Sequence, residues 1–202
     1  PLARGGSRSL DINTVIDNAK KLLDSGYKEI VLTGVNTGDY NYSDANKNNY
    51  KLINVLNELE KLGIPRIRIS SIEPNLLTDE IIQLVKSSKS FCRHFHIPLQ
   101  SGDPETLKLM RRRYSRDYYE ELICRLNSEM PDTGIGVDVI VGFPQETDER
   151  FENTLNFLEK LPVSYLHVFS YSERKNTHAV MLEGRVDITK RKQRSRILRD
   201  LS

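Results

Sequence analysis

The sequence predicts an α/β fold in which parallel strands alternate with helices. Two observations support this. Short runs rich in Val and Ile alternate with longer segments whose apolar residues recur every three or four positions. Each predicted strand also ends in a polar or glycine-containing loop, as at the carboxyl edge of a parallel sheet. About five strands are expected, each but the last followed by a helix, which fits a partial (β/α) barrel or an open doubly wound sheet.

The most complete strand, loop and helix occupy residues 134–161. Alternate positions from Ile135 to Val141 are apolar, which predicts a strand with one buried face, and Asp138 lies on the other face. The strand ends at Gly142, and Thr147 is a suitable N-cap for the helix that follows. Because ligands of parallel α/β proteins bind beyond the carboxyl ends of strands, the loop 142–147 is the first candidate for a binding site.

The remaining elements follow from the same criteria. Helices are expected over 12–23, 52–62, 78–85, 118–130 and 189–201, with another beginning at Pro104, and strands over 29–33, 66–70, 91–98 and 165–170. Residues 41–50 are polar and show no periodicity, so we expect a mobile excursion from the core.

Composition limits the classes of function. The 202 residues include 38% hydrophobic and 29% charged residues, which suits one soluble domain, and the net charge of +2 requires a local basic patch for any contact with nucleic acid. Cys92 and Cys124 form no CxxC, which predicts a reducing compartment and no disulfide or metal motif of their own. No membrane span or signal peptide is recognisable, so we expect a cytoplasmic protein.

Polar side chains recur at every predicted strand exit. They are Thr33, Gly34, Asn36, Ser70, Ser71, Glu73, Gln100, Ser101, Gly142, Glu146, Tyr171, Ser172 and Arg174. Loops are generally polar, but repetition at each exit favours a rim that binds a small polar ligand.

His94 and His96 are two residues apart on a predicted strand, so both point to one face, as paired metal ligands do in some barrel hydrolases. Hydrogen-bonded core histidines are the alternative, since we find no Asp or Cys cluster at ligand spacing beside them. A metal-dependent hydrolase using His94, His96 and Glu73 therefore stays open. A binding scaffold without catalysis also stays open.

Two basic segments have no unique interpretation. Arg111–Arg113 precedes Tyr114 and suits either a clamp for a carboxylate or phosphate or a solvated surface. The run Lys190–Arg196 lies in the last predicted helix, and we expect it to be solvated.

Five ordered motifs resemble the radical S-adenosylmethionine methylthiotransferases, which add a methylthio group to a tRNA base or a ribosomal protein residue. The motifs are SSIEPNLL from Ser70, HFHIPLQSG from His94, LMRRRY from Leu109, DVIVGFPQET from Asp138 and HVFSYSERKNT from His167. SSIEPN and YSERxNT most resemble the enzymes that act on threonylcarbamoyladenosine beside the tRNA anticodon. Enzymes acting on isopentenyladenosine or on a ribosomal protein are the alternatives within the family.

The resemblance implies that residues 1–202 are one radical S-adenosylmethionine core domain. The start, PLARGGSRS, resembles the stretch that follows the family's CxxxCxxC loop, whose thiolates hold a [4Fe-4S] cluster, so we expect the cluster ligands and the first βα unit to lie outside this chain. Alone, the chain is expected to be inactive. An uncovered sheet edge at 29–33 would favour self-association, and tRNA is the substrate that the resemblance implies.

The resemblance also implies a set of residues for S-adenosylmethionine. Gly34 and Asn36 would meet its methionyl group. Its carboxylate or ribose would meet Glu73, Gln100 and the segment that includes Arg111 and Arg113, and its adenine would meet Val168–Tyr171, with Phe169 and Tyr171 as candidates. Ser101 and Gly142 complete the set, and no catalytic residue or metal ligand is assigned. Gln145 and Ser170 depart from the family, which usually has Gly at the first position and often Pro or Thr at the second.

Overall fold

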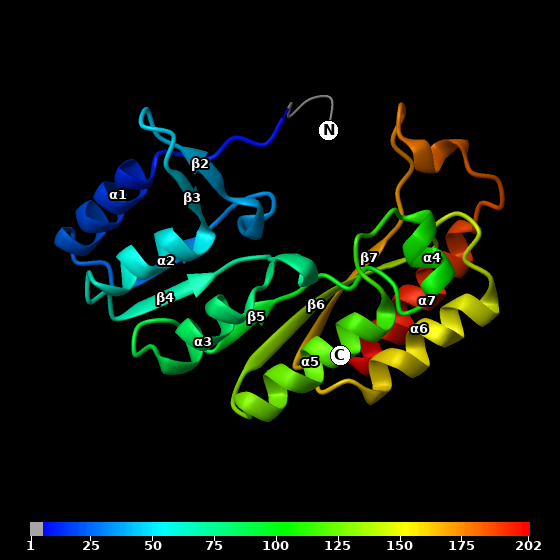
Figure 1. Cartoon of the computed structure of the whole chain (residues 1–202). Helices are drawn as coiled ribbons and strands as arrows, with labels where there is room; N and C mark the ends of the chain where they lie inside the picture. Colours follow the sequence, from blue (N-terminus) through cyan, green and yellow to red (C-terminus); the bar gives the residue numbers. More distant parts are fainter. Residues whose placement is uncertain (1–5) are drawn as a thin grey trace. The chain divides into compact units, whose positions relative to one another are not determined.

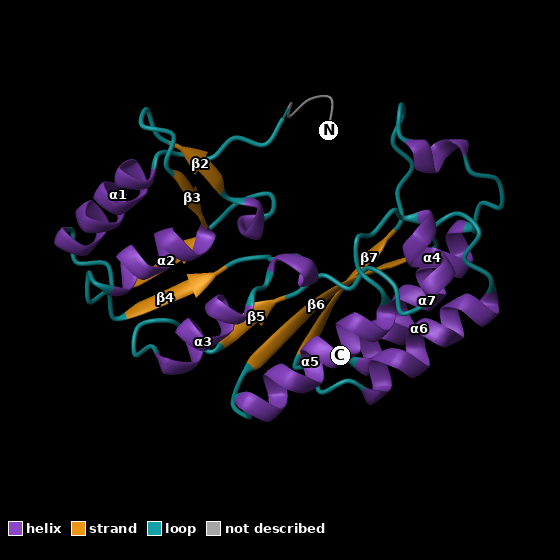
Figure 2. Ribbon diagram, viewed as in Figure 1, coloured by secondary structure: helices purple, strands orange, loops and turns teal. Residues whose placement is uncertain are grey.

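The computed structural model describes residues 6–202, and the chain divides into two compact units, Pro1–Phe95 and His96–Ser202. Figures 1 and 2 show strands with helices packed beside them in each. The strands β1, β4, β5, β6 and β7 lie in parallel arrangements, whereas β2 and β3 are antiparallel. The predicted α/β class with parallel strands is therefore confirmed.

The first unit contains a short parallel pair with helices beside it. Its helices are α1 (Ile12–Asp24), α2 (Leu52–Glu60) and α3 (Asp79–Ser87), with short 3-10 turns η1 (Thr37–Asp39) and η2 (Pro74–Leu76). Strands β1 (Glu29–Leu32) and β4 (Arg66–Ile69) pair in register, so that Ile30 lies beside Ile67. Leu56, Leu59 and Ile67 are fully buried, and this apolar core stabilises the unit.

The polar segment 41–50, expected as an excursion from the core, has no buried residue and forms a hairpin that the sequence did not predict. Strands β2 (Asn41–Ser43) and β3 (Asn49–Lys51) pair antiparallel and place Tyr42 opposite Tyr50. The turn between them is held by Asp44, whose carboxylate accepts the backbone N–H groups of Asn46 and Asn48 at 2.9 Å each. Short strands joined by an Asp-centred turn give no apolar periodicity, and this is why the pattern was missed.

The second unit is built on a three-stranded parallel sheet in the order β5-β6-β7. These strands are β5 (His94–His96), β6 (Gly134–Val141) and β7 (Tyr165–Ser170), and the helices are α4 (Pro104–Leu109), α5 (Arg116–Glu129), α6 (Asp148–Lys160) and α7 (Ile188–Leu201), with the turn η3 (His178–Met181). β5 is shorter than the predicted strand 91–98. The pairing with β6 nevertheless continues past its end, because the Ile97 N–H donates to the Gly136 carbonyl at 2.9 Å.

The two faces of the β6 strand differ in burial. Ile135, Val137 and Val139 are fully buried, whereas Asp138 and Ile140 are only half-buried. Helices α5, α6 and α7 lie along one side of β6 and β7 (Figure 1), and the alternating apolar side chains fill that interface. The other face, called the polar face below, carries Asp138 beside Ile140.

Tyr119 ties α5 to the segment that follows β5. Its side chain is fully buried, and its hydroxyl donates to the Ile97 carbonyl at 2.8 Å. Burial raises the pKa of Tyr119 well above its usual value. We predict that Tyr119→Phe lowers the free energy of unfolding by about 1–3 kcal/mol, because a buried carbonyl loses its donor.

Urea denaturation measures this change. Tyr27→Phe is the matched control, since Tyr27 is 59% exposed, and it should leave the unfolding free energy within about 0.5 kcal/mol of the parent. Equal effects of the two substitutions would show that the Tyr119 hydroxyl contributes nothing specific.

Candidate functional site

The loop after β6 has a backbone that requires glycine at its first position. Gly142 has φ +76°, and its N–H donates to the Glu146 carboxylate at 2.8 Å. A Cβ at Gly142 would collide with the Arg191 side chain. Gln145 has φ 68° as well, and non-glycine residues are strained in this region. Thr147 caps α6 as predicted, accepting the Arg150 N–H at 3.2 Å.

A buried ion pair holds this loop against α7. One guanidinium nitrogen of Arg194 lies 2.6 Å from the Glu146 carboxylate, and the two side chains are 3% and 2% exposed. The same nitrogen donates to the Glu146 carbonyl at 2.9 Å, and the other donates to Asp148 at 2.7 Å. The guanidinium also lies over the Phe151 ring. Arg194 therefore satisfies both the side chain and the backbone of the loop.

Arg191 makes the equivalent connection to the exit of β7. It donates to the Tyr171 carbonyl at 2.9 Å and to the Glu173 carboxylate at 2.6 Å, and it lies over the Tyr171 ring. These contacts correct the prediction that Lys190–Arg196 is solvated, because Arg191 and Arg194 are 6% and 3% exposed. Their spacing of three residues places both on the inward face of α7, while Arg196 stays exposed.

The two carboxylates that these arginines hold have opposite pKa shifts. Burial raises the pKa of Glu146 above its usual value, although the Gly142 N–H and the Arg194 guanidinium act in the opposite direction. The bond from Arg191 lowers the pKa of Glu173 to about 2. Solvent reaches Glu173, whose side chain is 41% exposed.

The loop after β5 packs against α6. Gln100 has φ 71° and is 8% exposed, and its N–H donates to the Asp138 carbonyl at 2.8 Å. The hydroxyls of Ser101 and Thr154 lie 3.1 Å apart in the buried interface. A Cβ at Gly102 would lie 2.9 Å from the Thr154 backbone. The sequence QSG is therefore what allows the loop to approach the helix closely.

The predicted residues at the exits of β1 and β4 come together within the first unit. Asn36 accepts the Glu73 N–H at 3.4 Å, and the hydroxyls of Thr37 and Ser70 are 2.8 Å apart. Gly34 is exposed beside them. These contacts place two of the predicted strand exits side by side.

The exit of β7 has both an exposed and a buried candidate. Phe169 is 52% exposed. The Tyr171 ring packs edge-on against Phe143 with centroids 5.2 Å apart, and its N–H donates to the Val141 carbonyl at 2.8 Å. The Tyr171 hydroxyl is buried and has no hydrogen-bond partner among residues 6–202. An orphaned hydroxyl at a strand exit is expected where a ligand completes the bonding.

The arginine triplet lies where α4 ends. Arg111 has φ 56°, and its N–H donates to the Lys108 carbonyl at 2.9 Å, which closes the helix. Arg111 and Arg113 are exposed and Arg112 is half-buried. Two of the three guanidinium groups are therefore available to a ligand.

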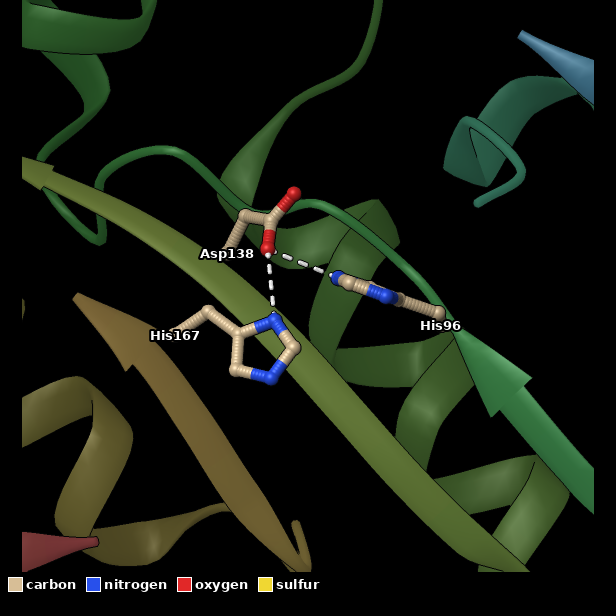
Figure 3. A group of neighbouring side chains, drawn as sticks. All are labelled: His96, Asp138 and His167. Carbon is tan, nitrogen blue, oxygen red and sulfur yellow. Dashed lines mark hydrogen bonds and ion pairs between the residues drawn. The ribbon is translucent and has the colours of Figure 1, made fainter. Parts of the chain in front are cut away.

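The polar face of the sheet carries a cluster that the sequence did not reveal (Figure 3). His96 Nε2 lies 2.7 Å from Asp138 Oδ1, and His167 Nδ1 lies 3.4 Å from the same oxygen. No acid lies at ligand spacing from His96 in the sequence, and its hydrogen-bond partner Asp138 lies 42 positions later. His94 instead lies 3.5 Å from Arg68, so the two histidines have different partners.

Comparison with known families decides the class of this chain. Residues 2–158 match the family model described as the radical SAM superfamily. The chain belongs to the radical SAM superfamily. This membership accounts for the parallel strands and for the polar loops at their exits.

Solved structures of radical SAM proteins have the same fold. One is a radical S-adenosylmethionine methyltransferase from Kitasatospora setae, with a TM-score of 0.62, 17% identity, and coverage of 79% of this chain and 31% of that one. Another is coproporphyrinogen III oxidase from Escherichia coli, with a TM-score of 0.58, 16% identity, and coverage of 94% and 41%. The radical SAM type of α/β fold is therefore confirmed.

Curated relatives are more similar in sequence. Threonylcarbamoyladenosine tRNA methylthiotransferases from Bacillus subtilis and Aquifex aeolicus are 45% and 40% identical over 93% and 100% of this chain, and over 41% and 48% of their own lengths. A tRNA-2-methylthio-N(6)-dimethylallyladenosine synthase from Bacillus subtilis is 37% identical over 96% of this chain and 38% of its own length. The chain thus spans less than half the length of these relatives.

Radical SAM proteins use S-adenosylmethionine and a [4Fe-4S] cluster. The residues of this chain suit S-adenosylmethionine but do not supply the ligands of the cluster. Its two cysteines, Cys92 and Cys124, are fewer than the three thiolates of the cluster motif. The orphaned Tyr171 hydroxyl and the exposed Phe169 ring leave one polar and one aromatic group without a partner of this kind among residues 6–202 at the exit of β7, which a bound small molecule would supply.

The Arg194 pair predicts a large effect on stability. Arg194→Met should lower the free energy of unfolding by about 3–5 kcal/mol, because it leaves the buried Glu146 carboxylate without its cation. Adding Glu146→Gln should restore part of that loss, since the uncompensated charge is then removed. Chemical denaturation measures both, with Arg196→Met as the exposed control. A loss no larger than that of the control would mean that the pair is not a stabilising element.

The Glu173 pKa predicts an acid-dependent contribution. Because the folded pKa of about 2 lies below the ordinary value of 4.5, the contribution is fully present above pH 4.5 and decreases as the pH falls toward 2. Glu173→Gln should therefore lower the melting temperature at pH 7 and have progressively less effect below pH 4.5. Thermal denaturation of both proteins between pH 7 and pH 3 checks this. A difference that is independent of pH would contradict the assigned pairing.

Proposed function

We propose that this chain is the core of a tRNA-modifying methylthiotransferase that acts on threonylcarbamoyladenosine beside the anticodon by radical S-adenosylmethionine chemistry. The observation that carries the proposal is the 45% and 40% identity to threonylcarbamoyladenosine tRNA methylthiotransferases over almost the entire chain. Identity to a dimethylallyladenosine synthase is lower, at 37%. That second substrate is the alternative, and residues 1–202 would act as one core domain in either case.

We further propose that the strand exits bind S-adenosylmethionine, which supplies the radical chemistry when bound. The exposed Phe169 ring offers a surface on which the adenine can stack, and the Tyr171 hydroxyl offers an unsatisfied donor two residues further along the chain. Gly34, Asn36 and Glu73 would face the methionyl end, which is consistent with the bond that joins the exits of β1 and β4.

The remaining proposed contacts come from the loops of the second unit. Gly142 would contribute through its loop, whose backbone it allows to turn sharply with Arg191 packed against it. Gln100 and Ser101 would shape the site from the loop after β5. Since the Ser101 hydroxyl already lies 3.1 Å from that of Thr154, we assign Ser101 to positioning this loop. Arg111 and Arg113 would hold the carboxylate.

The cellular context of the proposed reaction is the cytoplasm, where tRNA is modified. Among residues 6–202, no helix has the length and apolar character needed to cross a bilayer.

We also propose that the free edge of β1 supports self-association. Within residues 6–202, β1 has one strand neighbour, β4, and Val31 on it is 47% exposed. An unpaired strand edge offers N–H and C=O groups to another chain. Sedimentation velocity at low micromolar concentration should show a dimer or larger species. A strict monomer would contradict this proposal.

Nucleoside analysis tests the proposed substrate. Deleting the full-length gene should remove the methylthio form of threonylcarbamoyladenosine from hydrolysed tRNA and leave its unmodified precursor. Mass spectrometry measures both, and the methylthio form of dimethylallyladenosine is the internal control. Loss of the control nucleoside alone would favour the alternative substrate, and no change in either would contradict the proposed function.

The placement of the carboxylate generates a further prediction. In full-length protein, Arg→Lys at Arg111 or Arg113 should weaken the affinity for S-adenosylmethionine about tenfold or more, because Lys keeps the charge but loses the planar fork. Arg196→Lys on the exposed face of α7 is the control; Arg191 and Arg194 are unsuitable because they are buried. Calorimetry measures the affinities. Unchanged binding in both variants would place the carboxylate elsewhere.

A further inference from the structure

We propose that His96, Asp138 and His167 form a binding site for a divalent transition-metal ion. This site differs from the iron-sulfur cluster of the superfamily, because its donors are two imidazoles and a carboxylate and include no thiolate. Figure 3 shows both imidazole rings directed at the same carboxylate oxygen. The proposal does not depend on the proposed methylthiotransferase activity, because none of its three donors is among the proposed contacts to S-adenosylmethionine.

The sheet itself brings the donors together. The register of β6 and β7 places Asp138 directly beside His167, so their side chains leave the same face of neighbouring strands. His96 ends β5 on the other side of β6 and reaches the same oxygen. Donor atoms of the three residues lie within 4.8 Å of one another. Because three adjacent strands supply them, the geometry is fixed by the fold and not by a loop.

The distances are close to those required around an ion. Bonds of about 2.0–2.1 Å in tetrahedral geometry place neighbouring ligand atoms about 3.3 Å apart. His167 Nδ1 is already 3.4 Å from Asp138 Oδ1. His96 Nε2 is 2.7 Å from that oxygen, so its ring needs to recede by about 0.6 Å to match the bond lengths of such a site. A rotation of the partly exposed side chains supplies this movement.

Exposure and hydrogen bonding also suit an ion. The side chains of His96, Asp138 and His167 are 19%, 20% and 50% exposed, so the site is sheltered on one side and open on the other. No residue of 6–202 other than the two histidines bonds to the Asp138 carboxylate. Three protein ligands leave a coordination position for water or another oxygen ligand, which is the pattern of an open metal site.

The donor set selects the class of ion. Two imidazoles with one carboxylate suit Zn²⁺, and the same set with open positions suits Fe²⁺. Either ion requires a lone pair on His96 Nε2 and on His167 Nδ1. A neutral imidazole meets this requirement when its proton moves to the other ring nitrogen, and an imidazolium releases one proton to solvent. Protons therefore compete with the metal ion for these two nitrogens.

Metal titration of this chain tests the proposal. For this titration Cys92→Ser and Cys124→Ser are introduced into the parent and into every variant, because these substitutions remove competing thiolates. Calorimetry with Zn²⁺ should then give one site per chain, Co²⁺ should give ligand-field absorption characteristic of nitrogen and oxygen donors, and anaerobic Fe²⁺ competition ranks the two ions. His96→Asn, Asp138→Asn and His167→Asn should each weaken the affinity by about 100-fold or more, since even outer partners of metal ligands account for 10–100-fold.

His94→Asn is the matched control, because His94 lies two residues away on the same strand but has Arg68 as its partner. It should leave the affinity unchanged, and circular dichroism confirms that each variant is folded. His167→Asn is decisive if the others misfold, because His167 is the most exposed member. Absence of stoichiometric binding, or equal affinity in the parent and His167→Asn proteins, overturns the proposal. Either result would leave a hydrogen-bonded cluster only and would not affect the proposed tRNA modification.

Discussion

The buried pair of Arg194 and Glu146 is the interaction on which the candidate site depends most. Two opposite charges that are 3% and 2% exposed are stable only when their hydrogen bonds are satisfied. Glu146 meets this condition by accepting the Gly142 N–H, and Arg194 meets it by donating to the Glu146 carbonyl as well. The pair thus fixes a loop that has no regular structure of its own.

The same helix fixes the neighbouring strand exit through a second arginine. Arg191 fills the space beside Gly142 and holds both the Tyr171 carbonyl and Glu173. A single helix therefore sets the relative position of the loops after β6 and β7, which together with the end of β7 carry three of the proposed ligand contacts, Gly142, Phe169 and Tyr171. Substitutions on α7 are consequently expected to alter binding indirectly, through loop geometry.

The sheet of the second unit separates stability from chemistry. Its helix-covered face carries the apolar side chains of β6, and its other face carries the Asp138 cluster. Alternation along a strand produces this separation directly, since neighbouring residues point to opposite faces. An acid in the middle of an apolar strand is tolerated because it lies on the open face, where histidines of the adjacent strands satisfy it.

The sequence by itself determined the local features. Apolar periodicity located the principal helices and the parallel strands. Thr147 and Gly142 identified a helix cap and a turn, because each affects only the backbone close to it in the sequence. The hairpin over 41–50 escaped prediction because its pairing is held by tyrosines and an Asp-centred turn and not by an apolar pattern.

Only the tertiary structure decided which charged residues are buried and which distant residues meet. A basic run looks the same in sequence whether water or carboxylates surround it, so the burial of Arg191 and Arg194 depended on Glu173 and Glu146, which lie in other segments. His96 likewise acquired Asp138 as a partner only through the pairing of their strands. Local patterns report the interactions of a residue with its chain neighbours, whereas ion pairs and donor clusters arise from strand order and helix packing.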